Sequence, residues 1–333
     1  MKRAVLYAPG QLVVEDAAVP DVGPGMVGIA VSHCGICGSD VHIYHGRIPA
    51  RIPQVMGHEL SGRIAQIGPG VTGLAIGDRV VVDPSVQCGS CSFCRQASPN
   101  LCPEIHWPVG GFAEYTVASA DKVYVIPDCL DLDTAALAEP ASCCLRAIDL
   151  AGIKSGESVL IVGGGAIGLI VARLAVISGA GLVMLSEPVK ERRDVARQLG
   201  VDVTIDSINE SLRDVVSSCT DGLGVDVAIE AVGNAHTVRD SIEAPRRGGR
   251  VVVMGVAPTD LTIEISPYDI YARELSIRGS NLNPYTFERT VRLLPRLGLE
   301  PVITRHVEIE EVEDAIRNAG KTGDIKVLVD FPR

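Results

Sequence analysis

The chain has 333 residues, too many for one ordinary domain but enough for two domains that each bury a core. Its 30 basic and 41 acidic residues give a net charge of −11, and it has no basic run, so nucleic acid is not an expected partner. The longest apolar run, 159–172, is too short and too rich in glycine for a membrane span. Because Pro9-Gly10 also interrupts the N-terminus before a signal peptide can build, we expect a soluble cytoplasmic protein with no membrane partner.

Short hydrophobic runs divide the chain into two regions of different pattern. From Ala4 to about residue 127, β-branched runs are separated by Gly, Pro and Asp turns, which predicts an irregular, mainly antiparallel β domain. From Ser155 to about residue 280, apolar strands alternate with helix-like stretches, which predicts a doubly wound parallel sheet covered by helices. The expected strands of this sheet include 159–162, 182–185, 225–229 and 251–254, and after Asn281 we expect helices over 287–297 and 309–319 and strands over 302–307 and 325–329.

The first group of residues with metal-ligand chemistry consists of Cys37, His58, Glu59 and Glu139. A thiolate, an imidazole and a carboxylate would leave one position of a zinc ion open for a substrate. Scattered Cys, His and Glu residues are more often core or surface residues, so these residue types do not establish a metal site by themselves. The hypothesis of a catalytic zinc therefore depends on the neighbouring motifs.

A compact cysteine motif is the strongest single signal in the sequence. Cys88-x2-Cys91-x2-Cys94-x7-Cys102 lies in a loop rich in Gly, Ser and Pro. Four thiolates on one short loop can surround one zinc ion tetrahedrally and leave no position open. A disulfide pair or an iron–sulfur cluster is the alternative, but cysteines of a cytoplasmic chain stay reduced, and this spacing favours zinc. The loop therefore predicts a structural zinc site.

A glycine-rich turn follows the apolar strand at 159–162. Its sequence, Gly163-Gly164-Gly165-Ala166-Ile167-Gly168, has the G-x-G-x-x-G spacing and precedes a helix-like stretch. That spacing is weak evidence alone but strong evidence between a strand and a helix. Such glycines let the backbone approach a pyrophosphate, whose charge is favoured by the free N–H groups at the start of the helix. The turn therefore predicts a dinucleotide-binding site.

An acidic residue after the next strand bears on the choice of dinucleotide. Glu187 lies 19 residues beyond Gly168, where a carboxylate can accept hydrogen bonds from the adenosine ribose, although a merely solvated glutamate is the alternative. A carboxylate repels a 2′-phosphate, so NAD is expected rather than NADP. Arg192 weakens the expected preference for NAD, because a nearby arginine can accommodate a phosphate. The residues expected to bind the cofactor are Gly163, Gly165, Ile167, Gly168, Glu187 and Arg192.

With these motifs in chain order, the sequence resembles the zinc-dependent medium-chain alcohol dehydrogenase family, and most closely its sorbitol and polyol dehydrogenase branch. The resemblance runs from Met1 to Val329. It implies a Rossmann domain over 141–281 within a mainly β, GroES-like catalytic domain made of 1–140 and 282–333, with the active site between the two. The matching segments are 35–40, 57–59, 77–80, the cysteine loop, 139–140, the glycine-rich turn and 325–327.

The resemblance also implies roles for individual residues. Ser39 matches the hydroxyl residue beside the substrate alcohol, and His42 matches the outer end of a proton relay. Glu139 matches a carboxylate that either binds the metal or holds its water. The ligands implied for the catalytic zinc are Cys37, His58, Glu59 and Glu139.

The implied activity is the interconversion of a secondary alcohol or polyol and its ketone by NAD-linked hydride transfer, with one catalytic and one structural zinc ion per chain. Where related sorbitol dehydrogenases place a Tyr and an Arg against the polyol, this chain has Ile43 and Leu282, which predicts a more apolar pocket. Trp107 is a candidate lining residue or a packing anchor. The alternative substrate is a cyclitol, aminocyclitol or threonine-like amino alcohol. The alternative function, outside the enzymes, is that of a dinucleotide-sensing binding protein. The resemblance also suggests a homodimer or homotetramer joined at the Rossmann sheet edge near 274–279.

Overall fold

The computed structural model describes residues 1–320 and 323–331, and within it the chain forms two compact units. The first unit is assembled from segments far apart in the sequence, and its large sheet contains strands from both ends of the chain. Among the described residues, no helix is both long and apolar enough to cross a lipid bilayer. The first unit contains Met1–Pro140, Pro284–Arg296 and the chain from Ile303 onward, and the second contains Ala141–Asn283 and Leu297–Val302.

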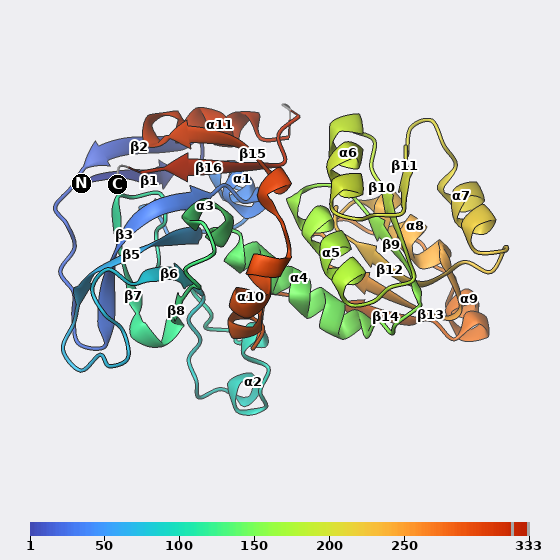
Figure 1. Cartoon of the computed structure of the whole chain (residues 1–333), viewed down its shortest axis with the longest axis horizontal. Coiled ribbons are helices and arrows are strands. Elements are labelled where there is room, and N and C mark those ends of the chain that lie inside the picture. The colour runs from blue at the N-terminus through green and yellow to red at the C-terminus, as the bar shows by residue number, and fades with distance from the viewer. Residues whose placement is uncertain (321–322, 332–333) are drawn as a thin grey trace. The chain divides into compact units, whose positions relative to one another are not determined.

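A seven-stranded sheet forms the centre of the first unit (Figure 1). Its strands run in the order β15-β16-β3-β5-β6-β8, with β7 also paired to β3. All pairs are antiparallel except β15 and β16, which are parallel. Apolar side chains such as Ile29, Leu60 and Val80 are fully buried on it. The strands are β3 (Met26–Gly35), β5 (Glu59–Ile67), β6 (Arg79–Val82), β7 (Tyr115–Ser119), β8 (Val123–Val125), β15 (Ile303–Glu308) and β16 (Lys326–Asp330).

A smaller sheet and several short helices complete the first unit. The small sheet has the order β2-β1-β4, with antiparallel pairs throughout. Its strands are β1 (Lys2–Ala8), β2 (Gln11–Asp16) and β4 (Gln54–Val55). The helices are α1 (Gly38–Tyr44), α2 (Ser92–Arg95), α3 (Leu132–Ala135), α10 (Phe287–Leu293) and α11 (Val312–Asn318), with the 3-10 turns η1 (Pro99–Leu101), η2 (Ala120–Lys122), η3 (Leu294–Arg296) and η5 (Ile309–Glu311).

The second unit is built on a parallel sheet of six strands in the order β11-β10-β9-β12-β13-β14. Counted within this unit, that is the order 3-2-1-4-5-6 of a doubly wound dinucleotide-binding sheet, in which ligands bind beyond the carboxyl ends of the strands where the order reverses. That reversal lies between β9 and β12. The strands are β9 (Ser158–Val162), β10 (Leu182–Ser186), β11 (Val203–Ile205), β12 (Val225–Glu230), β13 (Pro245–Val253) and β14 (Ser276–Gly279).

Helices cover this parallel sheet: α5 packs on β9 and β10, α6 on β11, and α8 on β12 and β13 (Figure 1). The neighbouring strands β9 and β10 are almost wholly apolar, as expected for strands buried on both faces. The fold class predicted from the sequence, a doubly wound sheet plus a mainly β unit, is confirmed. The helices are α4 (Ala138–Ala151), α5 (Ala166–Ile177), α6 (Lys190–Gln198), α7 (Leu212–Cys219), α8 (Ala235–Glu243) and α9 (Pro267–Arg273), with the 3-10 turn η4 (Glu300–Val302).

Candidate functional site

Three of the predicted catalytic-zinc ligands lie together in the first unit. One ligand atom from each of Cys37, His58 and Glu59 falls within 4.8 Å of the other two. Cys37 is the N-cap residue of α1, while His58 immediately precedes β5 and Glu59 begins it. Glu139, in the first turn of α4, is not a member of this group.

Asp40 fixes the orientation of this cluster, and it is fully buried. Its carboxylate accepts a hydrogen bond from the Cys37 backbone N–H at 2.9 Å and lies 3.5 Å from Nδ1 of His58. Burial would lower the pKa of His58, but Asp40 and Cys37 outweigh it and hold that pKa well above its ordinary value. Nδ1 therefore faces the carboxylate, and Nε2 is left toward Ser39, whose Oγ lies 3.5 Å away.

A buried ion pair holds Glu59. Its two carboxylate oxygens lie 2.9 and 2.7 Å from Nζ of Lys326, and both side chains are almost completely buried. The same ammonium group donates to the carbonyl of Ile36 at 3.0 Å. Burial would lower the pKa of Lys326, but Glu59 outweighs it and the pKa is raised. The ammonium group therefore stays charged, and β16 supplies the cation that lies against the Glu59 carboxylate.

Glu139 has a strongly perturbed carboxyl group. Burial and the negative charge of Glu59 raise its pKa, His58 opposes them, and the resulting pKa is about 7. Glu139 is thus close enough to the cluster to respond to its charges, although it lies outside the group of three.

The donor set of the cluster fits a catalytic zinc. Thiolate, imidazole and carboxylate are the ligand types that zinc takes, and three protein ligands leave one position open. A carboxylate offers about four lone-pair sites, so Glu59 can accept from Lys326 and still bind a metal. Glycine at position 35 is required beside it, because a Cβ there would lie 2.1 Å from a Glu59 oxygen.

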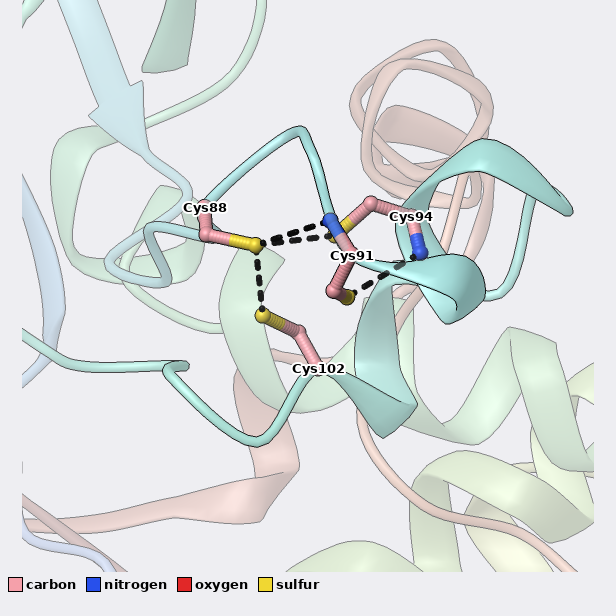
Figure 2. Close-up of side chains that lie close together, drawn as sticks. All are labelled: Cys88, Cys91, Cys94 and Cys102. Atoms are coloured by element: carbon pink, nitrogen blue, oxygen red, sulfur yellow. Dashed lines mark hydrogen bonds between the residues drawn. The ribbon is translucent and has the colours of Figure 1, made fainter.

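The four cysteines of the loop converge on a common centre, as Figure 2 shows. Cys91 is the N-cap of α2 and accepts from the Cys94 N–H, while Cys102 directly follows η1. The Sγ atom of Cys88 lies 4.0 Å from that of Cys94 and 3.6 Å from that of Cys102. Sulfur atoms bound at about 2.3 Å to a tetrahedral zinc lie about 3.8 Å apart, so the four residues fit a closed zinc site.

Local hydrogen bonds prepare this loop for a cation. The Cys91 backbone N–H donates to the Cys88 sulfur at 3.3 Å, and the Ser90 hydroxyl donates to it at 3.7 Å. Backbone and side-chain hydrogen bonds from Ser90 and Cys91 lower the pKa of Cys88 to about 6. A thiolate at this position is the form that binds metal.

The glycine-rich turn lies between β9 and α5, at the carboxyl end of β9. Gly163 has φ +106°, which other residues rarely adopt, and a Cβ on Gly168 would lie 1.9 Å from the Gly163 carbonyl oxygen. A Cβ on Gly165, in contrast, would have no described atom within 4 Å. These are the tight turn, the close helix packing and the open approach that a pyrophosphate-binding turn needs. Helix α5 begins at Ala166 without a side-chain cap from the described residues, so its first N–H groups fit an anion.

Glu187 is buried beside the glycine-rich turn. Its carboxylate accepts hydrogen bonds from the backbone N–H groups of Gly164 at 2.7 Å and Val189 at 2.9 Å. Nη1 of Arg192 lies 3.9 Å from one of its oxygens. The structure therefore brings Glu187 and Arg192 to the turn, in line with where the sequence placed a cofactor-binding acid and base. The remaining predicted residue, Ile167, lies in the first turn of α5.

Sequence reasoning missed two residues of the catalytic cluster. Lys326 begins β16 and is followed by three apolar residues, and a buried lysine there requires a counter-charge. Asp40 stands three residues after Cys37, the spacing of a capping box at the start of a helix. His42, by contrast, was predicted, and it lies half-buried in the last turn of α1. Trp107 is about half exposed.

Comparisons with known proteins agree with these sites. Residues 23–128 match the family described as alcohol dehydrogenase GroES-like domain, and residues 166–298 match zinc-binding dehydrogenase. Sorbitol dehydrogenase of Bacillus subtilis is 32% identical over 99% of this chain and 97% of its own. L-threonine 3-dehydrogenase of Pyrococcus horikoshii is 37% identical over 93% of each chain.

A solved structure gives the same result. A zinc-binding dehydrogenase from Sinorhizobium meliloti, bound to NADP, superposes with a TM-score of 0.95 and 37% identity over 99% of both chains. Identity of this order over nearly the whole length, with the cysteine loop and glycine-rich turn in place, shows the family. The chain belongs to the zinc-binding dehydrogenases of the medium-chain alcohol dehydrogenase family.

Proposed function

We propose that this protein is a dehydrogenase that interconverts a secondary alcohol or polyol and its ketone, with NAD as the hydride acceptor and two zinc ions per chain. The observation that carries the proposal is the convergence of Cys37, His58 and Glu59 within 4.8 Å, a three-ligand set with an open position. Cys88, Cys91, Cys94 and Cys102 would hold the second, structural zinc.

The chain's own residues would position the alcohol and remove its proton. When bound, zinc supplies Lewis-acid polarisation of the alcohol oxygen, and NAD supplies the hydride acceptor. Asp40 holds the His58 ring, and Ser39 presents its hydroxyl 3.5 Å from Nε2 of that ring. His42 follows Ser39 by three residues on α1 and so shares its helix face. We infer that Ser39 accepts the alcohol proton and that His42 passes it to solvent.

The relay predicts unequal effects for its two members. Ser39→Ala is expected to lower kcat by roughly 10²–10⁴-fold, the usual contribution of general acid–base catalysis, with zinc content and NADH binding unchanged. His42→Ala is expected to act more mildly, and imidazole in solution should partly restore it but not Ser39→Ala. Ser39→Thr, which keeps the hydroxyl, is the matched control and should retain most activity. Near-normal kcat in Ser39→Ala would reduce Ser39 to a turn residue.

Cofactor preference is proposed to depend on the buried Glu187 carboxylate. NAD is expected to have the higher kcat/KM, because the carboxylate accepts from ribose hydroxyls and repels a 2′-phosphate. Because a relative of this chain binds NADP, the kcat/KM values for NAD and NADP must be compared directly. Glu187→Gln keeps an acceptor for the Gly164 N–H but removes the charge, so it should narrow the NAD/NADP ratio by roughly tenfold or more. Glu187→Ser should narrow it as well. Equal kcat/KM values for both cofactors in the unmodified enzyme would contradict this proposal.

The substrate class is proposed from the family and from residues of this chain. By their names, the relative from Bacillus subtilis acts on the polyol sorbitol, and the relative from Pyrococcus horikoshii acts on the amino alcohol L-threonine. Ile43 and Leu282 in place of polar residues favour a more apolar secondary alcohol over sorbitol. A screen of polyols, cyclitols, aminocyclitols, threonine-like amino alcohols and butanediols for NAD reduction tests the proposal. Reduction with at least one class is expected, whereas NAD binding without turnover on any of them would favour a dinucleotide sensor.

We also propose the domain division and assembly of the enzyme. The catalytic domain would comprise 1–140 and 282–333, and the dinucleotide-binding domain 141–281. The two compact units support this division except at 282–283 and 297–302, which belong to the second unit. Strand β14 is one of the two edge strands of the parallel sheet, and all four of its residues are exposed. Exposed strand edges invite pairing with another chain, so a homodimer or homotetramer joined at β14 is the proposed assembly.

A further inference from the structure

A third group of metal-ligand residues lies in the first unit, outside both the catalytic cluster and the cysteine loop. It consists of His33 on β3, His306 on β15 and Asp330 at the end of β16, three neighbouring strands of the large sheet. Asp330 pairs in register with His33 across the antiparallel β3–β16 ladder. His306 pairs with Leu328, two residues before Asp330, so its side chain reaches the same face.

Both imidazoles point the same ring nitrogen at one carboxylate. Nδ1 of His33 lies 2.7 Å from Oδ1 of Asp330, and Nδ1 of His306 lies 2.9 and 3.0 Å from its two oxygens. The two rings meet edge to face, with centroids 6.0 Å apart. One atom from each residue falls within 4.8 Å of the others, as in the catalytic cluster. Two side chains from distant parts of the chain therefore converge on a single acceptor.

One of the three ligand residues is buried, and the other two are exposed to solvent. The His33 side chain is only 10% exposed, whereas Asp330 is 39% and His306 43% exposed. His33 is fixed by packing, and an ion from solvent can reach the carboxylate past His306. Such a fixed inner ligand with accessible outer ligands is suited to reversible binding of a cation.

We propose that His33, His306 and Asp330 form a third metal site, selective for a transition-metal dication such as Zn²⁺. Imidazole and carboxylate ligands suit zinc and its neighbours, whereas magnesium and calcium prefer all-oxygen sites. The carboxylate supplies negative charge that attracts a dication, and the two imidazoles supply nitrogen donors. A carboxylate only accepts hydrogen bonds, so each Nδ1 donates its proton to Asp330 in the metal-free cluster. On binding, that proton moves to Nε2 of the same ring, and the Nδ1 lone pair becomes the ligand.

The spacing of the three residues requires only a small adjustment. Ligands about 2.0–2.2 Å from a tetrahedral zinc lie roughly 3.3–3.6 Å apart, slightly farther than the present contacts of 2.7–3.0 Å. Asp330 is the last residue of β16 and His306 is exposed, so both can move by that amount. Solvent would occupy the remaining coordination position. A bound ion would tie β15 and β16 to β3.

The test uses the full-length, tag-free protein with its cysteine-containing sites filled with zinc. Titration with Co²⁺ should add one cobalt ion per chain, with an absorption spectrum that lacks the thiolate-to-metal charge-transfer band of a sulfur site. His306→Ala and Asp330→Asn should each lose this added ion. His236→Ala is the matched control, because His236 is also exposed and lies 3.4 Å from Asp240 but, among the described residues, belongs to no group of three metal-ligand residues.

The outcomes separate this site from the catalytic one. The proposal does not depend on the dehydrogenase activity, since its ligands are not those of the catalytic cluster. Cobalt that shows a thiolate charge-transfer band has replaced zinc at a cysteine site, and if no further cobalt binds, the proposal fails. Unchanged cobalt binding in both His306→Ala and Asp330→Asn would likewise overturn it. In either case the three side chains form only a hydrogen-bonded cluster.

Discussion

Replacing His58 by Ala is expected to abolish alcohol oxidation while leaving a folded protein that still binds NADH. The imidazole is one of three ligand residues within 4.8 Å, and its loss removes the metal that polarises the alcohol oxygen. Metal catalysis supplies several kcal/mol, and each 1.36 kcal/mol is tenfold in rate, so kcat should fall by at least roughly a thousandfold. The zinc content, measured by mass spectrometry on purified protein, should fall by one ion per chain.

Cys94→Ser is the matched control for that experiment, because it addresses the other metal. It should also remove one zinc, but its main effect should be on stability, with loosening of the loop around α2 and aggregation or dissociation. NADH binding, followed by its fluorescence, reports whether the second unit stays folded in both variants. If the unmodified protein held one zinc, and His58→Ala kept it with full activity, the catalytic zinc assignment would be wrong.

Breaking the buried pair between Lys326 and Glu59 is expected to have the largest effect on stability. Lys326→Met leaves a carboxylate that is 0% exposed without its cation. Removing one partner of a buried ion pair costs about 3–5 kcal/mol, since the remaining charge is uncompensated. The single tryptophan, Trp107, lies in the first unit, so its fluorescence in a denaturant titration reports the unfolding of that unit.

A double variant distinguishes lost charge balance from lost packing. Glu59→Gln combined with Lys326→Met removes both charges and should recover most of the free energy of unfolding, although the catalytic ligand is lost. Lys2→Met, which breaks an exposed pair with Glu310 in the same unit, should change stability little. If Lys326→Met unfolds at the same denaturant concentration as the unmodified protein, the pair does not stabilise the unit.

The sequence predicted the second unit well because its apolar strands and helices alternate regularly. The strand expected over 159–162 is β9 (Ser158–Val162), and that over 182–185 is β10 (Leu182–Ser186). The sequence did not predict the start of α5, because the helix begins at Ala166, within the glycine-rich turn. Glycine has low helix propensity, but contact with β9 overrides it here.

Contacts between distant residues could not be predicted from spacing alone. Lys326 and Glu59 are separated by 267 positions, and His33 and Asp330 by 297. Each pair depends on how β16 aligns with β3 and β5, which no local pattern encodes. The zinc site of the cysteine loop, in contrast, could be predicted, because its ligands lie on one short segment, 88–102. The role of Asp40 was also local, and its spacing from Cys37 could have indicated it.

The central claim, that the chain transfers hydride from an alcohol carbon to a nicotinamide, is tested most directly with a labelled substrate. The best alcohol from the screen is prepared with deuterium on its carbinol carbon and incubated with NAD and the zinc-loaded enzyme, and the reduced cofactor is analysed by mass spectrometry. We predict that each reduced cofactor molecule carries one deuterium and that turnover with the labelled alcohol is slower. Reduced cofactor without deuterium, or no reduced cofactor with any alcohol in the screen, would contradict the proposed function.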